Sequence, residues 1–332
     1  HRLIRRQRQM CIRDRNKKIL VGGQAVIEGV MMRVPGAYAT AVRKPDGSIV
    51  TDRHDFTSAT EKHRFLKRPV LRGVVALFES LKIGLSTLQF SADIAIKAEE
   101  EAQGKEHKEE NRFLSGLTMF FALVLAFGLF GFLPLYITTE LLDIEKKAFA
   151  FNIVAGLWRI LFFLAYLWII SLMKDVRRLF HNHGAEHKVV FTFEHGKELI
   201  VENTREYSTF HPRCGTSFIF IVLLASILMF ALIDTIVIAV LGNITLPLRL
   251  VFHLLMLPLV SGVGYEFLKL TAKYQHTWWR RSLSAPGLWL QRITTRPPDD
   301  DQIEVAIVAL KTAFGDSLAD YAGQEFIAEA VE

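Results

Sequence analysis

Three residues in the middle of the chain have the types and spacing of a metal-dependent site: His183, Glu186 and His187. The two histidines are four residues apart, so on a helix both imidazoles point to one side, where they can bind one Zn²⁺ ion. Glu186 lies on the same side, where its carboxylate can act as a general base toward water at the metal. The pattern H-x-x-E-H is that of the inverted zinc hydrolases. The alternative is a polar, partly buried turn that holds no metal.

A second pair of candidate ligands, His211 and Cys214, follows downstream, and Gly215 permits a tight turn after them. Four ligands would make a closed structural site, whereas three ligands and a water would make a catalytic one. In a catalytic site, Arg213 or Lys188 would stabilise a developing oxyanion. The alternative is that Cys214 is a small residue of the hydrophobic core and binds no metal.

The residues that follow His187 argue against a continuous helix. The run Val189–Phe193 is rich in β-branched and aromatic residues and predicts a strand, paired with 199–202 across His195 and Gly196. Gly184 also weakens a helix. We therefore expect the two histidines to lie at a helix end.

A glycine-punctuated run, 22–33, carries three further polar candidates for the site, Gln24, Glu28 and Arg33. It lacks the G-K-[ST] of a phosphate-binding loop, so nucleotide binding is disfavoured. The glycines predict a close approach of the backbone to another element. Glu28 could add a carboxylate to the metal; the alternative is an ion pair with Arg33 or Arg72.

The elements that must position these residues include four segments apolar and long enough to cross a bilayer, which takes about 20 residues. They run over 113–138, 148–173, 216–241 and 246–270. The chain of 332 residues is 51% hydrophobic, and its mean hydropathy is positive. The predicted fold class is an α-helical polytopic membrane protein with four transmembrane helices and a small α+β cytoplasmic portion.

Basic residues crowd the long connection 174–215 and the outer flanks of the four segments, whereas the two short connections carry few. The positive-inside rule therefore predicts a multi-pass protein of the inner (plasma) membrane with both termini cytoplasmic. The predicted organisation is a leader (1–18), a cytoplasmic N-terminal region with a β-hairpin and an amphipathic helix (19–112), a first transmembrane hairpin (113–173), a cytoplasmic loop with the candidate metal site (174–215), a second transmembrane hairpin (216–270) and a cytoplasmic tail (271–332).

Within the cytoplasmic portion, the turn residues 45–47 between the runs 38–43 and 48–52 predict a β-hairpin. The stretch 70–97 is apolar but interrupted by charges, which favours an amphipathic or interfacial helix over a span. In the tail, 299–301 are acidic and can cap a helix. Four apolar residues share one face of that helix: Ile303, Ala306, Ile307 and Leu310.

Two charged residues fall inside the predicted spans, Arg159 in the second and Asp234 in the third. Charges in lipid are costly and normally face a partner or a cavity. By depth they can meet, and His253 can join them. They are either a packing ion pair or a proton or ion relay, and the relay would indicate a transporter or channel.

The first residues are strongly basic, which is a pattern of nucleic-acid binding, but 1–15 begin without Met and carry no apolar period. We interpret them as a non-native leader and expect no nucleic-acid partner. With only two cysteines, one of them Cys11 in the leader, we expect no disulfide framework.

Five runs in order along the chain resemble the YqhQ-like family of bacterial membrane proteins: 22–33, 72–77, 183–188, 211–217 and 286–291. That family carries a domain of unknown function and has been described as predicted metal-dependent enzymes. The resemblance implies a multi-span inner-membrane protein with a cytoplasmic site, and it implies no substrate.

The leading functional hypothesis is a zinc-dependent hydrolase at the cytoplasmic face that acts on a membrane lipid or a membrane-bound peptide. The alternative is a non-enzymatic scaffold or assembly factor, in which the same residues form a structural metal or polar knot and a partner protein docks. A transporter or channel is the third hypothesis. The sequence does not indicate the oligomeric state.

Overall fold

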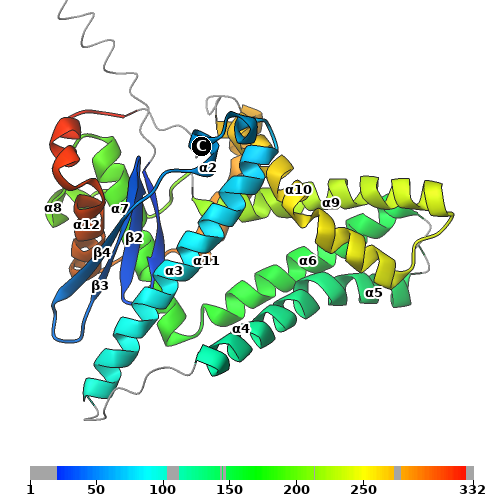
Figure 1. The fold of residues 1–332 in the computed structure, drawn as a ribbon, viewed down its shortest axis with the longest axis horizontal. Coiled ribbons are helices and arrows are strands. Elements are labelled where there is room, and N and C mark those ends of the chain that lie inside the picture. The colour runs from blue at the N-terminus through cyan, green and yellow to red at the C-terminus, as the bar shows by residue number, and fades with distance from the viewer. Residues whose placement is uncertain are drawn as a thin grey trace, which may run out of the picture.

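The computed structural model describes residues 21–102, 112–142, 144, 147–212, 214–272 and 278–326. The predicted leader, 1–18, and Arg213 lie outside the described residues. The molecule has two parts: a sheet covered by helices, and a bundle of long apolar helices that extends away from it (Figure 1). The sheet and its covering helices gather at one end of the bundle.

The sheet is a four-stranded antiparallel meander in the order β1-β2-β3-β4. Its strands are β1 Gly22–Val26, β2 Gly29–Val34, β3 Ala37–Arg43 and β4 Ile49–Asp55. The predicted hairpin is confirmed as β3 and β4. The glycine-punctuated run, in which we predicted no strand, forms β1 and β2. A two-residue loop joins them, and Glu28 in that loop has a positive φ of 53°.

One face of the sheet packs against two helices, α7 Lys174–Glu194 and α12 Asp300–Phe314. Val30 and Met32 of β2 pair with Ala41 and Ala39 of β3, and all four side chains enter this core. The four predicted apolar residues of the tail helix are buried in it as expected. Asp299 caps α12 through a reciprocal capping box with Gln302.

Helix α3, Leu71–Ala102, lies on the opposite face of the sheet and links it to the bundle. Gly84 of α3 packs against Gln24 of β1, where an added Cβ would meet Oε1 at 2.8 Å. At its other end Gly73 packs on α10, and an added Cβ there would lie 2.9 Å from the Cα of Gly262. The helix predicted over 70–97 is therefore confirmed, and it bridges the two parts of the molecule.

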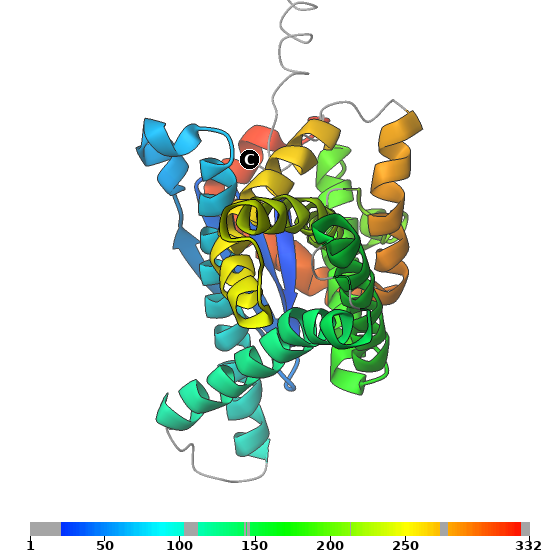
Figure 2. The same cartoon turned by 90° about the vertical axis from the view of Figure 1, so that its right-hand side faces the viewer.

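Among the described residues, four helical stretches have the length and composition of membrane spans, which confirms the predicted four: Gly116–Leu141, Ala148–Ile170, Phe218–Leu241 and Leu246–Lys269. The helices that form them are α4 Arg112–Phe127, η2 Gly128–Phe132, α5 Leu133–Leu141, α6 Ala148–Ile170, α9 Gly215–Leu241 and α10 Leu246–Ala272. Figure 2 views the bundle from its far end, with the sheet behind it. The remaining helices are α2 Ala59–Lys62, η1 Arg64–Lys67, α8 Val201–Arg205, α11 Trp278–Thr294 and η3 Gly315–Tyr321.

The strand expected over Val189–Phe193 is wrong, because α7 continues through it, and 199–202 leads into α8 rather than a second strand. Val189, Val190 and Phe193 lie on one side of the helix and are buried against the sheet. That burial outweighs their preference for strands. Gly184 does not end the helix either: it lets the chain at Arg296 pass close by, since an added Cβ would lie 2.0 Å from that carbonyl oxygen.

Candidate metal centre

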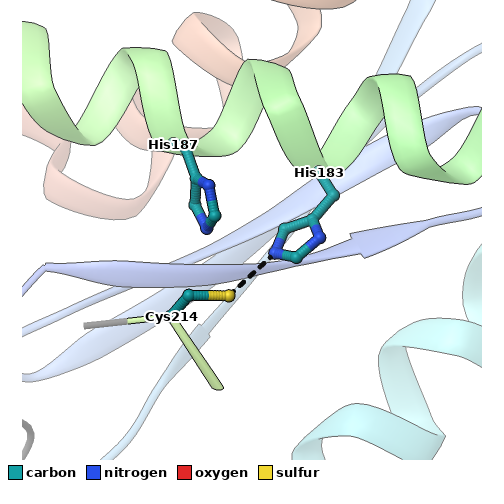
Figure 3. A group of neighbouring side chains, drawn as sticks. All are labelled: His183, His187 and Cys214. Carbon is teal, nitrogen blue, oxygen red and sulfur yellow. Dashed lines mark hydrogen bonds between the residues drawn. The ribbon is translucent and has the colours of Figure 1, made fainter. Parts of the chain in front are cut away.

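His183, His187 and Cys214 form a cluster in which one potential ligand atom of each lies within 4.8 Å of the others. Figure 3 shows both imidazoles hanging from α7 toward the sulfur. The two histidines are one helical turn apart on α7, and Cys214 is the N-cap of α9. Nε2 of His183 lies 3.2 Å from Sγ of Cys214. Residues distant in sequence thus meet where the third span begins.

The outer nitrogens of both imidazoles are fixed by backbone carbonyls. Nδ1 of His183 donates to the Thr294 carbonyl at 2.8 Å, and Nδ1 of His187 donates to the Thr209 carbonyl at 2.5 Å. A carbonyl only accepts, so each Nδ1 carries the proton and each Nε2 presents a lone pair to the cluster. Protein zinc sites use the same arrangement to orient imidazole ligands.

The carboxylate of Glu186 enters the same space. Its Oε2 lies 3.5 Å from Nε2 of His187 and 4.0 Å from Nε2 of His183. Burial lowers the pKa of His187, so near pH 7 its ring is neutral and carries no charge to offset the carboxylate. Two nitrogen lone pairs and an anion that converge in a buried site favour a bound cation.

The donor set and spacing fit zinc. Zn–N distances of about 2.0–2.1 Å and Zn–S of about 2.3 Å place tetrahedral N and S ligands roughly 3.6 Å apart, close to the 3.2 Å between His183 and Cys214. Sγ of Cys214 also accepts from the backbone N–H of Thr216 at 3.5 Å. It sits at the N-terminus of a 27-residue helix, where the helix dipole favours negative charge such as that of a metal-bound thiolate.

His211 lies beside the cluster but outside the group of three. Its backbone N–H and carbonyl are both bonded to the side-chain amide of Gln291, each at 2.8 Å. Its Nε2 is 3.6 Å from Oε2 of Glu194, and its ring centroid is 5.5 Å from that of His187. Burial lowers the pKa of His211 to about 4. His211, the predicted fourth protein ligand, is therefore a neutral side chain beside the site in this arrangement.

The three candidates from the glycine-punctuated run do not reach the cluster. Glu28 forms an ion pair with Arg178 of α7 at 2.6 Å, not with either arginine named from the sequence. Arg33 stacks its guanidinium over the Phe56 ring at 4.5 Å. Gln24 faces α3. The predicted close approach comes from a neighbouring glycine of the same strand.

That glycine is Gly23, whose Cα faces Glu186: an added Cβ would lie 2.7 Å from Cγ of that glutamate and 2.5 Å from the Met31 carbonyl oxygen. The backbone of β1 thus packs directly against the side chain of Glu186.

Lys188 turns away from the cluster, since its Nζ donates to the carbonyls of Arg205 and Tyr207. Lys188 is therefore not an oxyanion partner at the site in this arrangement. Arg213, the other predicted partner, lies outside the described residues.

Several residues that shape the site were not predicted from the sequence. Thr294 and Thr209 act through backbone carbonyls, for which no side-chain type is diagnostic. Gln291 holds the chain of His211, and it is fully buried. A signal for Gln291 existed, because it ends one of the five runs on which the resemblance rests.

A second polar cluster lies between the spans. His253 Nε2 is 3.0 Å from Oδ1 of Asp234, and its Nδ1 is 3.5 Å from Nη2 of Arg159. The three residues predicted to meet therefore do so, with the histidine in the middle. The guanidinium that pairs with Asp234 belongs to Arg249, with Nε 2.9 Å from Oδ2, and this partner was not predicted.

The fold and the cluster together define a four-span helical protein with an α+β part that carries a His/Cys site beside the membrane helices. The family described as "Protein of unknown function (DUF1385)" matches residues 68–316, and the chain belongs to it. The chain is 34% identical over 299 residues, 86% of its own length and 89% of the relative's, to a protein named "Uncharacterized protein YqhQ" from Bacillus subtilis (strain 168). The predicted family is confirmed. No solved structure matches the chain.

Proposed function

We propose that this protein is a zinc-dependent hydrolase that works at the cytoplasmic face of the inner membrane. One observation carries the proposal: two imidazole Nε2 atoms, oriented by carbonyl bonds at their Nδ1 atoms, converge with a cysteine sulfur beside a buried carboxylate. Three protein ligands leave one coordination position of a tetrahedral metal, which is the arrangement of catalytic rather than structural zinc.

His183, His187 and Cys214 would hold the metal. A zinc ion there supplies Lewis acidity that lowers the pKa of water to about 7. Glu186 takes the proton from the attacking water and returns it to the leaving group, since its Oε2 faces both imidazole nitrogens at 3.5 and 4.0 Å. The bonds from Nδ1 to the carbonyls keep both rings from turning as the charge changes.

The position of the site supports a substrate held in the membrane. Cys214 precedes the span Phe218–Leu241 by four residues, which is about 6 Å along a helix. A lipid or a membrane-bound peptide reaches such a site without leaving the bilayer. The proposed orientation, with that loop and both termini in the cytoplasm, is supported by the basic residues of 174–215 and of the outer flanks.

The test is a zinc assay joined to a rate assay on the full chain, purified without a tag and reconstituted in vesicles. We expect about one zinc per chain by mass spectrometry, lost in His183→Ala. Glu186→Gln should keep the zinc but slow the hydrolysis of a fluorogenic phospholipid ester or a membrane-anchored peptide ester by about 10²–10⁴-fold. A chain that purifies and reconstitutes without zinc, or a Glu186→Gln variant with an unchanged rate, contradicts the proposal.

A second candidate function is a scaffold with a structural metal, and the burial of the site favours it. His187, Glu186 and Cys214 are 2%, 5% and 7% exposed, which suits a knot that ties α7 to the start of α9. In that case a partner protein docks on the cytoplasmic part, and Glu186→Gln keeps both the zinc and the biological role. Chelation then lowers the thermal midpoint of the chain as well.

A further inference from the structure

A cavity of about 350 Å³ lies among the spans, apart from the metal centre. Its walls come from the first span and from α6, α9 and α10, and they are apolar except for Arg159, Ser226 and His253. Residues of its wall include Phe127, Phe130, Arg159, Phe230, His253 and Leu257. An apolar pocket with a few convergent polar groups is the usual form of a ligand site.

Arg159 is the charged residue among those that line the cavity. It occupies the middle of α6 and is only 6% exposed. Its Nε donates to the Phe130 carbonyl at 3.3 Å, and Nη2 lies 3.5 Å from Nδ1 of His253. Its Nη1 is buried and has no hydrogen-bond partner among the described residues. A buried guanidinium nitrogen without an acceptor is costly, and an acceptor in the cavity would remove that cost.

The carboxylate of this cluster is bonded to residues other than Arg159. Asp234 is the carboxylate of this cluster, and it already contacts Arg249 at 2.9 Å, Asn152 at 2.7 Å and His253 at 3.0 Å. The described hydrogen bonds of Arg159 go to the Phe130 carbonyl and to His253, and neither partner is a carboxylate. A guanidinium at the depth of a span is unfavourable in lipid without an anionic partner, so the cavity calls for an anion.

The mouth of the cavity is formed by side chains that face the surroundings of the bundle. Phe127, Ile219, Leu254 and Leu257 all line it and are 40%, 47%, 50% and 43% exposed. These residues belong to the stretches with the composition of spans, so their exposed sides face lipid rather than water. An occupant therefore enters sideways from the bilayer.

We propose that this cavity binds a single-chain anionic amphiphile, with its carboxylate on Arg159 and its acyl chain along the apolar wall. A guanidinium and a carboxylate match in geometry and charge, and Nη1 provides the donor that has no partner in the protein. The volume is near the lower limit of ligand pockets, about 300–1,000 Å³, which suits one chain. A phospholipid, with two chains and a large headgroup, does not fit.

The test uses the full chain in nanodiscs of phosphatidylcholine, with palmitate as the probe and hexadecanol as its neutral match. Palmitate should bind at least about tenfold more tightly, because only it offers a carboxylate. Arg159→Gln should abolish that preference, and Arg159→Lys should keep part of it. Equal binding of the two probes to the unsubstituted chain overturns the proposal and needs no variant to fold.

A pair of substitutions on α10 tests the location. Leu257 lines the mouth, whereas Leu255 is 64% exposed and does not line the cavity. Leu257→Trp should weaken palmitate binding about tenfold and Leu255→Trp should leave it unchanged, with the zinc content the same in both. Equal effects of the two variants, or displacement of palmitate by phosphatidylglycerol added to the nanodisc, overturn the proposed site.

Discussion

The cluster on α7 gathers lone pairs, whereas the cluster between the spans gathers hydrogen-bond donors. At the first, a Glu186 oxygen lies 4.0 Å from Nε2 of His183 and 3.5 Å from Nε2 of His187. At the second, Asp234 is surrounded by arginine, asparagine and histidine groups, and Nη1 of Arg159 has no acceptor among the described residues. The same cost of burying polar groups therefore calls for a cation in one region and an anion in the other.

The largest effect should separate ligands from neighbours in the first cluster. Cys214→Ala removes a ligand atom within 4.8 Å of both imidazole nitrogens, so we expect the zinc affinity to fall at least about a thousandfold, or roughly 4 kcal/mol. His211→Ala removes a ring that lies outside the group of three and should keep about one zinc per chain. The measurement is a competition titration with a zinc chelator on the purified chain.

The two variants also decide between the open and the closed site. Loss of zinc in His211→Ala equal to that in Cys214→Ala would mean that His211 rotates to become the fourth ligand, as the sequence allowed. The site would then be a structural zinc site, and the first cluster would no longer be a candidate for catalysis.

The next effect concerns the ion pair of the second cluster. Arg249 and Asp234 are both fully buried, so Arg249→Leu leaves a carboxylate without its guanidinium. We expect a loss of about 3–5 kcal/mol of stability, measured as the shift of the unfolding transition in denaturing detergent. The double variant Arg249→Leu with Asp234→Leu should recover most of it, because the buried charge is removed with its partner.

A double variant as unstable as the single one would show that Asp234 stabilises the bundle through other bonds. His253 and Asn152 provide the candidates, at 3.0 and 2.7 Å. In that case the second cluster is a hydrogen-bonded network rather than an ion pair.

The elements that the sequence predicted well are those with a single dominant cause. Hydropathy over about 20 residues determines a span, and the turn 45–47 and the tail-helix face were equally clear. The convergence of His183, His187 and Cys214 followed from residue type. The helix through Val189–Phe193 did not, because local preference favoured a strand and only the packing against the sheet, which the sequence does not show, reverses it.

Partners were predicted less well than positions. Arg249 lies just inside its helix, at the fourth residue of a span, and so reads as a boundary charge rather than the partner of Asp234. Glu28 pairs with Arg178, 150 residues away, although two nearer arginines were available in the sequence. Long side chains reach several candidates, and only the fold selects among them.

A smaller effect should come from the backbone that presses on Glu186. An alanine at Gly23 would place its Cβ 2.7 Å from Cγ of Glu186 and 2.5 Å from a β2 carbonyl, so we expect about 1–3 kcal/mol of lost stability and a lower hydrolytic rate. Gly22→Ala is the matched control, because nothing lies within 4 Å of its added Cβ. Equal thermal midpoints for the two variants would show that β1 does not hold the carboxylate in place.

The smallest effect concerns an ion pair at the protein surface, which we compare with the buried pair at Asp234. Arg205 of α8 bonds Asp300 at the start of α12, with both side chains 55% exposed, and its hydrogen bond lowers the pKa of Asp300. Solvent and salt screen such a pair, so Arg205→Ala should lower the thermal midpoint by less than about 2 °C at pH 7.

The sign of the pH dependence follows from the lowered pKa. A carboxyl whose folded pKa lies below its unfolded value contributes stability above the unfolded value, near 3.8, and loses it as the pH falls through the folded one. The parent chain and Arg205→Ala should therefore differ slightly at pH 7 and converge under more acidic conditions, and 1 M salt should also bring them together. A difference in thermal midpoint that persists in acid and in salt would mean that Arg205 interacts with a group other than Asp300. Solvent exposure alone would then not explain why the buried pair at Asp234 stabilises the protein more.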